Sequence, residues 1–212
     1  MSFFIDGPGV RLESVLREPR GGGLRGAAVL CHPHPVYGGT MDSRVVFRAA
    51  KAVEAARFAA LRFNFRGAGA SSGSFDEGNG EKDDVAAVID WLEKRYPRRP
   101  LALVGFSFGA WVGLQVGCSD PRIEALVGLG LPLNFYNFDF LTENEKPTLF
   151  VVGTRDEFCP MEKLDFLERL LPASSSVRRI EGEDHFFASQ LERVQSLISS
   201  FFEGIHLEGR AK

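Results

Sequence analysis

Short apolar runs alternate with longer segments of helical periodicity along most of the chain, and this alternation constrains the fold more than any other feature. The predicted strands are Val10–Leu16, at an edge of the sheet, followed by Ala27–Cys31, Phe58–Phe65, Leu101–Phe106, Ala125–Gly130, Thr148–Gly153 and Val177–Ile180. The predicted helices are Ser43–Ala56, Glu81–Tyr96, Ser107–Val116, Pro160–Leu171 and Gln190–Phe202. This alternation predicts an α/β fold, with a mostly parallel sheet and helices on both faces. Ligands bind such a sheet beyond the carboxyl ends of its strands, so the chemistry should lie just after the apolar runs.

Length and composition predict a single domain. The chain has 212 residues, of which 44% are hydrophobic and 25% charged, and this is the usage of an ordinary globular protein. Division by about 150 residues per domain favours one domain over two. The sequence contains no internal repeat and no interdomain linker. Residues 1–212 are therefore predicted to form one domain, with a polar C-terminal tail over residues 204–212.

Charge and cysteine usage exclude several classes of protein. The net charge is −3 and no basic stripe is present, whereas a nucleic-acid binder usually carries one. Cys31, Cys118 and Cys159 lie far apart, which argues against a disulfide framework or a zinc site and suits a reducing compartment. Met1–Val10 lacks the pattern of a signal peptide, and no apolar run approaches the roughly 20 residues of a membrane span. We expect a cytoplasmic protein that binds neither nucleic acid nor membranes; a homodimer is compatible with the sequence.

The strongest chemical signal is the segment Gly105–Gly109 (GFSFG), a G-x-S-x-G motif. It lies between the predicted strand Leu101–Phe106 and the helix that begins near Ser107. A nucleophilic serine in this context occupies a sharp strand-to-helix turn, and small residues two positions before and after it let the strand and helix approach closely. An ordinary glycine-rich turn is the alternative. The flanking elements favour Ser107 as the nucleophile.

A serine hydroxyl is a weak nucleophile unless a base takes its proton, and histidine is the usual base because its pKa lies near neutrality. Among the four histidines, only His185 follows the last predicted strand and therefore lies at the carboxyl end of the sheet. His206 lies in the polar tail and is interpreted as a surface residue. His185 is the predicted base, with a packed loop histidine as the alternative.

The base needs a carboxylate that holds its tautomer and stabilises its charged form. Asp156 follows the predicted strand Thr148–Gly153 and lies at the same edge of the sheet. Asp184 adjoins His185, and neighbouring side chains usually diverge; Glu157 is a second choice. A turn or capping aspartate is the alternative for Asp156. We expect Asp156 to orient the base.

The chain order serine, aspartate, histidine matches that of the α/β-hydrolases. Further motifs add to this match: HPHP at 32–35 with YGG at 37–39, FNFRG at 63–67, GFSFGA at 105–110 and HFF at 185–187. On these residues the sequence resembles the α/β-hydrolase superfamily over its whole core. It most resembles small bacterial serine hydrolases of the dienelactone hydrolase-like and serine aminopeptidase-like group. The resemblance implies the fold and a catalytic serine, but it says little about the substrate.

An oxyanion hole needs two main-chain N–H groups aimed at the developing alkoxide. One should come from Phe108, the residue after the nucleophile. The other should come from the loop after Ala27–Cys31, where Pro33 and Pro35 have no N–H and His34 has one. Similarity to the His-Gly-x loops of the superfamily indicates the same position, although proline stands here where glycine is common. We therefore expect Phe108 and His34 to hold the oxyanion.

His32 and His34 also admit a metal-binding interpretation. Residues at i and i+2 on a strand share a face and can bind one metal ion. No spacing in the sequence suggests further ligands, so His32 is interpreted as a structural residue that hydrogen-bonds inside its loop. We expect no metal and no organic cofactor.

Only Leu131–Pro147 separates two consecutive predicted strands at the place where many relatives insert a helical cap. The segment is too short for such a cap and is rich in aromatic residues. Together with aromatic residues of other loops, these are predicted to wall a shallow apolar substrate pocket; the residues are Tyr37, Phe135, Tyr136, Phe138 and Phe186. The alternative is that these rings fill the core beneath a loop. A weakly capped pocket predicts small acyl substrates and no interfacial lipid handling.

The sequence therefore predicts a serine hydrolase of the carboxylesterase type, which cleaves small acyl esters through an acyl-enzyme on Ser107. A peptidase, an amidase or a thioesterase would use the same three residues. A peptidase often carries an acidic pair for a free amino terminus, and Asp76-Glu77 is such a pair, although it is first interpreted as solvated charge. A non-catalytic ligand-binding protein with the hydrolase fold is the alternative from another class.

Overall fold

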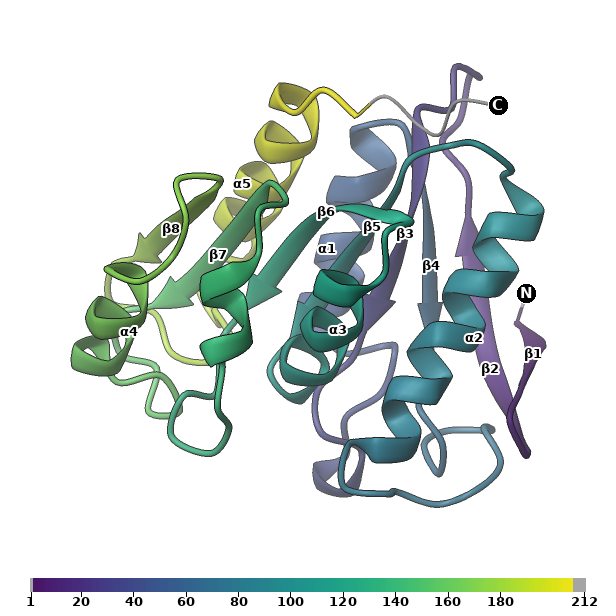
Figure 1. Ribbon diagram of the computed structural model, residues 1–212, viewed down its shortest axis with the longest axis horizontal. Helices are drawn as coiled ribbons and strands as arrows, with labels where there is room; N and C mark the ends of the chain where they lie inside the picture. Colours follow the sequence, from purple (N-terminus) through teal and green to yellow (C-terminus); the bar gives the residue numbers. More distant parts are fainter. Residues whose placement is uncertain (1, 208–212) are drawn as a thin grey trace.

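The computed structural model describes residues 2–207, which form a sheet between two layers of helices (Figure 1). The strands in this part of the chain are β1 (Phe3–Gly7), β2 (Val10–Arg17), β3 (Gly26–Cys31), β4 (Phe58–Phe63), β5 (Leu101–Phe106), β6 (Ile123–Leu129), β7 (Thr148–Gly153) and β8 (Ser175–Ile180). The helices are α1 (Arg44–Ala55), α2 (Asn79–Arg95), α3 (Phe108–Ser119), α4 (Met161–Glu168) and α5 (Leu191–Gly204), with short 3-10 helices η1 (Pro35–Tyr37) and η2 (Asp139–Glu143). Among residues 2–207, every helix is too short or too polar to cross a membrane.

The strands lie in one sheet in the order β1-β2-β4-β3-β5-β6-β7-β8. β1 and β2 pair antiparallel, as do β2 and β4, and the remaining pairs are parallel. The predicted α/β fold with a mostly parallel sheet is confirmed. The predicted edge position of Val10–Leu16 is wrong, because Phe3–Gly7 folds back across the turn at Pro8 and Gly9 and forms the edge itself. The apolar run of β1 is only three residues long, from Phe3 to Ile5, and only Ile5 is fully buried, so the segment is too short to predict a strand by itself.

Two apolar cores cover the two faces of the sheet. The helices α1 and α5 pack against each other on one face, and α2, α3 and α4 lie on the other (Figure 1). The central strands β3, β4, β5 and β7 are buried along their whole length. Parallel strands covered on both faces are expected to be apolar throughout, and this explains the unbroken hydrophobic runs in the sequence.

The loops at the carboxyl ends of the strands position the predicted site. Ser107 lies between β5 and α3, Asp156 follows β7, and His185 follows β8. Between β6 and β7, residues 130–147 contain η2 as their only helix, so no helical cap covers this end of the sheet.

The predicted helix bounds differ from the observed ones by a few residues. Helix α2 begins two residues earlier than predicted, because the Glu81 carboxylate accepts the N–H groups of Asp76 (2.9 Å) and Gly78 (2.8 Å) and closes the first turn. At the other end of the chain, α5 reaches Gly204. Residues 208–212 of the predicted tail lie outside the described residues.

Candidate active site

Ser107 occupies a strained turn between β5 and α3. Its φ is 57° and its ψ is −123°, a conformation that L-residues seldom adopt. Its N–H donates to the carbonyl of Leu129 on the neighbouring strand β6 (2.9 Å). A Cβ on Gly105 would lie 2.5 Å from the Cα of Ala110, and one on Gly109 would overlap the main chain at Cys31. The two glycines of the motif are therefore required for the close approach of strand and helix.

His185 lies beside Ser107, with its Nε2 2.9 Å from the serine Oγ. The imidazole is almost fully buried. Its loop is fixed at both ends: the Glu183 carboxylate accepts the Ser189 hydroxyl and N–H (3.1 Å to the nitrogen), and the ring of Phe187 is buried in the core. The hydrogen bonds from Ser189 hold the pKa of Glu183 below its ordinary value.

The other imidazole nitrogen of His185, Nδ1, lies 2.8 Å from Asp156 Oδ2. The Asp156 side chain is completely buried, and its second oxygen accepts the Phe158 N–H (2.9 Å). Because a carboxylate only accepts hydrogen bonds, Nδ1 carries the proton and Nε2 presents its lone pair to Ser107. The Asp184 carboxylate instead accepts the N–H of Phe186 (2.9 Å). The structure thus brings together the three predicted residues and leaves the adjacent Asp184 outside.

Three phenylalanine rings surround the His185 imidazole. Their centroids lie 4.6 Å (Phe158), 5.0 Å (Phe106) and 5.2 Å (Phe186) from that of the imidazole. The contacts to Phe158 and Phe186 are edge-to-face. These rings restrict rotation of the imidazole and keep water away from its hydrogen bond to Asp156.

The N–H groups of Phe108 and His34 have no acceptor among the described residues. Phe108 is the first residue of α3, where main-chain N–H groups have no partner within the helix. His34 precedes η1, and its carbonyl accepts the N–H groups of Tyr37 (3.2 Å) and Gly39 (3.0 Å). Its ring packs against Phe108 at 4.8 Å between centroids. The two N–H groups therefore belong to neighbouring loops whose side chains are in contact.

His32 is buried and both of its ring nitrogens are occupied. Nδ1 donates to the carbonyl of Pro33 (2.6 Å), and Nε2 accepts the N–H of Phe65 (2.9 Å). Burial lowers the pKa of His32 to about 4, so the ring is neutral at pH 7. The ring links the β3 and β4 loops and has no free nitrogen for a metal ion. Within residues 2–207, no cluster of three or more metal-ligating side chains is present.

A cavity of about 530 Å³ opens beside Ser107. The residues that line it are His34, Tyr37, Ser107, Phe108, Pro132, Phe135, Tyr136 and Phe158. Three of the five predicted pocket residues are in this set: Tyr37, Phe135 and Tyr136.

Two of the predicted pocket residues lie elsewhere. Phe138 is buried against Phe140, with 5.7 Å between centroids, because η2 begins directly after it and turns it into the core. Phe186 contacts His185 but does not line the cavity. Phe158 and Pro132 line the cavity but are not among the predicted pocket residues. Phe158 lies two residues after Asp156, and this spacing is the one feature of the sequence that could indicate its place near the site.

The comparisons with known proteins agree with this architecture. A family model for an alpha/beta hydrolase domain matches residues 27–200. An uncharacterised curated protein of Rickettsia prowazekii (strain Madrid E) is 34% identical over 207 residues, which are 93% of this chain and 87% of the relative. The structure of an alpha-beta serine hydrolase homologue from Coxiella burnetii is 34% identical with a TM-score of 0.89, covering 94% of this chain and 96% of that one. A serine hydrolase without lid from Xanthomonas campestris is 32% identical with a TM-score of 0.84, covering 95% and 92%.

The fold and the site therefore define a hydrolase. The chain belongs to the α/β-hydrolase family, as the match over residues 27–200 shows.

Proposed function

We propose that this hydrolase is a carboxylesterase-type serine hydrolase that cleaves small acyl esters through an acyl-enzyme on Ser107. One observation carries the proposal: His185 bridges the Ser107 hydroxyl and the Asp156 carboxylate, and Ser107 lines an open cavity. Three separate loops supply these groups.

The geometry supports the following sequence of steps. The Ser107 Oγ attacks the ester carbonyl while His185 Nε2 takes its proton, and Asp156 stabilises the resulting imidazolium. The N–H groups of Phe108 and His34 hold the oxyanion. His185 then gives the proton to the departing alcohol, which leaves the acyl group on Ser107. A water molecule activated by His185 attacks the acyl-enzyme and releases the acid.

The lining of the cavity argues against peptides that must be held by a free amino terminus. None of its side chains is a carboxylate, a lysine or an arginine. The predicted acidic pair lies outside it, and the Asp76 carboxylate accepts the N–H of Gly80 (3.0 Å) at the start of α2. The cavity therefore offers no acidic group for the ammonium of a peptide substrate, whereas a neutral ester needs none.

We also infer a reducing, cytoplasmic location for the reaction. Cys31, Cys118 and Cys159 are all free thiols. Burial raises the pKa of Cys159 to about 12, so this thiol near Asp156 is a poor nucleophile.

Labelling with a fluorophosphonate, read by intact mass, tests the proposal. We expect one adduct on the wild-type protein, none on Ser107→Ala, and an unchanged adduct on Ser196→Ala, which removes an exposed serine of α5. Esters, thioesters and aminoacyl amides of one acyl group then rank the bond types. If folded wild-type protein gives no adduct, a non-catalytic ligand-binding role replaces this proposal.

A further inference from the structure

We propose that the cavity beside Ser107 selects esters that carry a flat aromatic group, and that Tyr136 is the main specificity-determining residue. This inference rests on the proposed function and names the substrate class of the same site. It starts from the side chains that surround the cavity and from the contacts that hold them in place.

The lining of the cavity is aromatic rather than aliphatic. Five of its residues are phenylalanine or tyrosine, and no valine, leucine, isoleucine or methionine is among them. A pocket lined by aliphatic side chains would bind an alkyl group and an aromatic group of equal apolar area about equally well, because the gain from burying apolar area does not depend on the kind of ligand. Aromatic rings differ because their negative faces and positive edges favour offset-stacked or edge-to-face contacts with another ring. The lining therefore rewards a flat π system more than an alkyl group of equal size.

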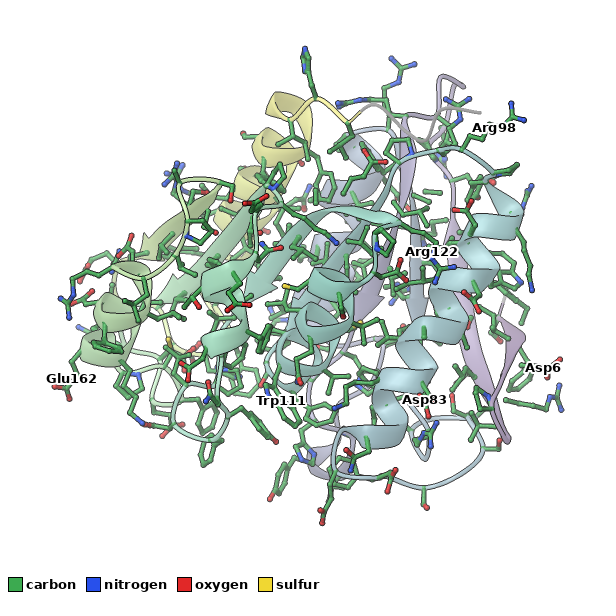
Figure 2. All side chains as sticks on the ribbon, viewed as in Figure 1. Asp6, Asp83, Arg98, Trp111, Arg122 and Glu162 are labelled. Carbon is green, nitrogen blue, oxygen red and sulfur yellow. The ribbon has the colours of Figure 1, made fainter. Side chains whose placement is uncertain are left out.

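Tyr136 is held in a fixed orientation before any ligand binds. It stacks on Trp111, with 4.2 Å between centroids and 16° between the ring planes. Trp111 lies in the first turn of α3, four residues after Ser107, and is labelled in Figure 2. The Trp111 ring in turn packs against Gly78, where a Cβ would lie 2.5 Å from its Cζ3. A wall that is ordered in advance loses little conformational entropy on binding, so it offers a flat ring surface to a ligand without rearrangement.

The rim of the cavity exposes two aromatic rings. Tyr37 is 85% exposed and Phe135 is 65% exposed. They belong to different loops, η1 after β3 and the segment after β6. Large exposed apolar side chains that gather at one place mark a binding surface. A bound aromatic group would cover surface that the protein alone leaves in water.

The cavity is also electrically neutral. Burial lowers the pKa of the His34 imidazole, and burial raises the pKa of the Tyr136 hydroxyl, so both groups are uncharged at pH 7. Asp6 and Glu162, both labelled in Figure 2, lie at opposite edges of the molecule. An uncharged aromatic ester therefore fits, and an aryl carboxylate finds no cation in the lining.

Matched pairs of esters without a chromogenic leaving group test the proposal. Methyl phenylacetate is compared with methyl cyclohexylacetate, and benzyl acetate with cyclohexylmethyl acetate, with acid release followed by pH-stat titration. The cyclohexyl ring has the same number of carbons but no π system. We expect kcat/KM to favour the aromatic member of at least one pair by about 2- to 10-fold. The pair that shows the preference identifies whether the acyl or the alcohol side binds the aromatic wall.

Variants then assign the preference to the wall. Tyr136→Leu should reduce the aromatic-to-cyclohexyl ratio of kcat/KM to about 1, and Phe135→Leu, at the exposed rim, should lower it partly. Phe4→Leu is the matched control, because Phe4 is an exposed ring on β1, outside the cavity. Its ratio should equal that of the wild type.

The outcomes separate the two proposals. Fluorophosphonate labelling of Ser107 together with equal rates within both pairs, or faster cyclohexyl esters, overturns the aromatic selectivity and leaves the serine hydrolase intact. A ratio that Tyr136→Leu and Phe135→Leu both leave unchanged overturns the assignment to this wall. Absence of labelling overturns both proposals.

Discussion

Gly109, in the first turn of α3, lies so close to the main chain of His32 that a Cβ atom on the glycine would overlap the His32 carbonyl oxygen. Phe108 directly precedes the glycine, and His34 follows in the loop that contains His32. This contact therefore sets the separation between the two N–H groups that we propose as the oxyanion hole.

Gly109→Ala should force α3 away from the β3 loop. We expect kcat to fall about 10²-fold, the usual cost of one lost oxyanion donor, and the free energy of unfolding to fall by about 1–3 kcal/mol from overpacking. Ester kinetics and urea denaturation measure the two effects. Gly204→Ala is the control, since no atom lies within 4 Å of a Cβ at that position. Full activity in Gly109→Ala would show that the separation of the two loops is not critical.

Asp156→Asn should abolish most of the activity without unfolding the protein. An asparagine amide can donate to Nδ1 and so favour the wrong imidazole tautomer, and loss of the carboxylate in such a triad costs about 10⁴-fold in kcat. The matched control is Asp184→Asn. Asp184 adjoins His185 in the sequence, but its carboxylate accepts hydrogen bonds from main-chain N–H groups. Steady-state kinetics on one ester compares them. A larger loss in Asp184→Asn than in Asp156→Asn would mean that the orienting carboxylate has been misassigned.

The sequence sufficed for the parallel sheet and for the meeting of Ser107, Asp156 and His185. Strands buried on both faces are continuously apolar, and the carboxyl ends of parallel strands share one edge, so residues that follow β5, β7 and β8 must come together. Gly105 and Gly109 also predict the sharp turn at Ser107, because glycine is required where the strand and the helix approach each other this closely.

The details of the aromatic pocket were not predictable in the same way. Phe138 and Phe135 lie three residues apart in one loop, yet one is buried and the other is 65% exposed. The difference in burial arises from the turn into η2. A 3-10 helix this short has no hydrophobic periodicity by which the sequence could predict it. Likewise, the apolar run of β1 is only three residues long, from Phe3 to Ile5, and the strand is placed by its pairing with β2.

We predict that His32 lowers the free energy of unfolding in acid. Burial lowers its pKa to about 4 in the folded protein, while the value in an unfolded chain is about 6.5. Between these values the unfolded chain binds more protons, so the free energy of unfolding should fall as the pH decreases from 6.5 to 4, by about 3 kcal/mol in total. Above pH 6.5 this residue contributes no pH dependence.

Urea denaturation at pH 7.5, 5.5 and 4.5 measures the effect. His32→Gln, which cannot titrate, should be less stable at pH 7.5 but should lose less stability on acidification than the wild type. If both proteins lose the same amount, the acid sensitivity originates in other groups.

We predict that Glu183 affects turnover although it lies outside the cavity. Its carboxylate binds Ser189 and closes the loop of His185, while its main-chain carbonyl, which a substitution leaves in place, accepts the N–H of Arg155 (2.8 Å) from the loop of Asp156. Glu183→Ala should lower kcat by about 10- to 100-fold, the scale expected when catalytic groups are misplaced by a fraction of an ångström to one ångström. KM should change little, because Glu183 does not line the cavity.

Glu183→Gln keeps an oxygen for the Ser189 hydroxyl and should restore most of the turnover. Glu181→Ala, on the exposed surface two residues earlier, should match the wild type. Because the pKa of the Glu183 carboxylate is lowered, its stabilising bonds are present above its ordinary pKa and are lost as the pH falls through the lower folded-state value. The rate of fluorophosphonate labelling, measured beside kcat, reports the reactivity of Ser107 directly. An unchanged labelling rate in Glu183→Ala would show that the His185 loop holds its position without this carboxylate.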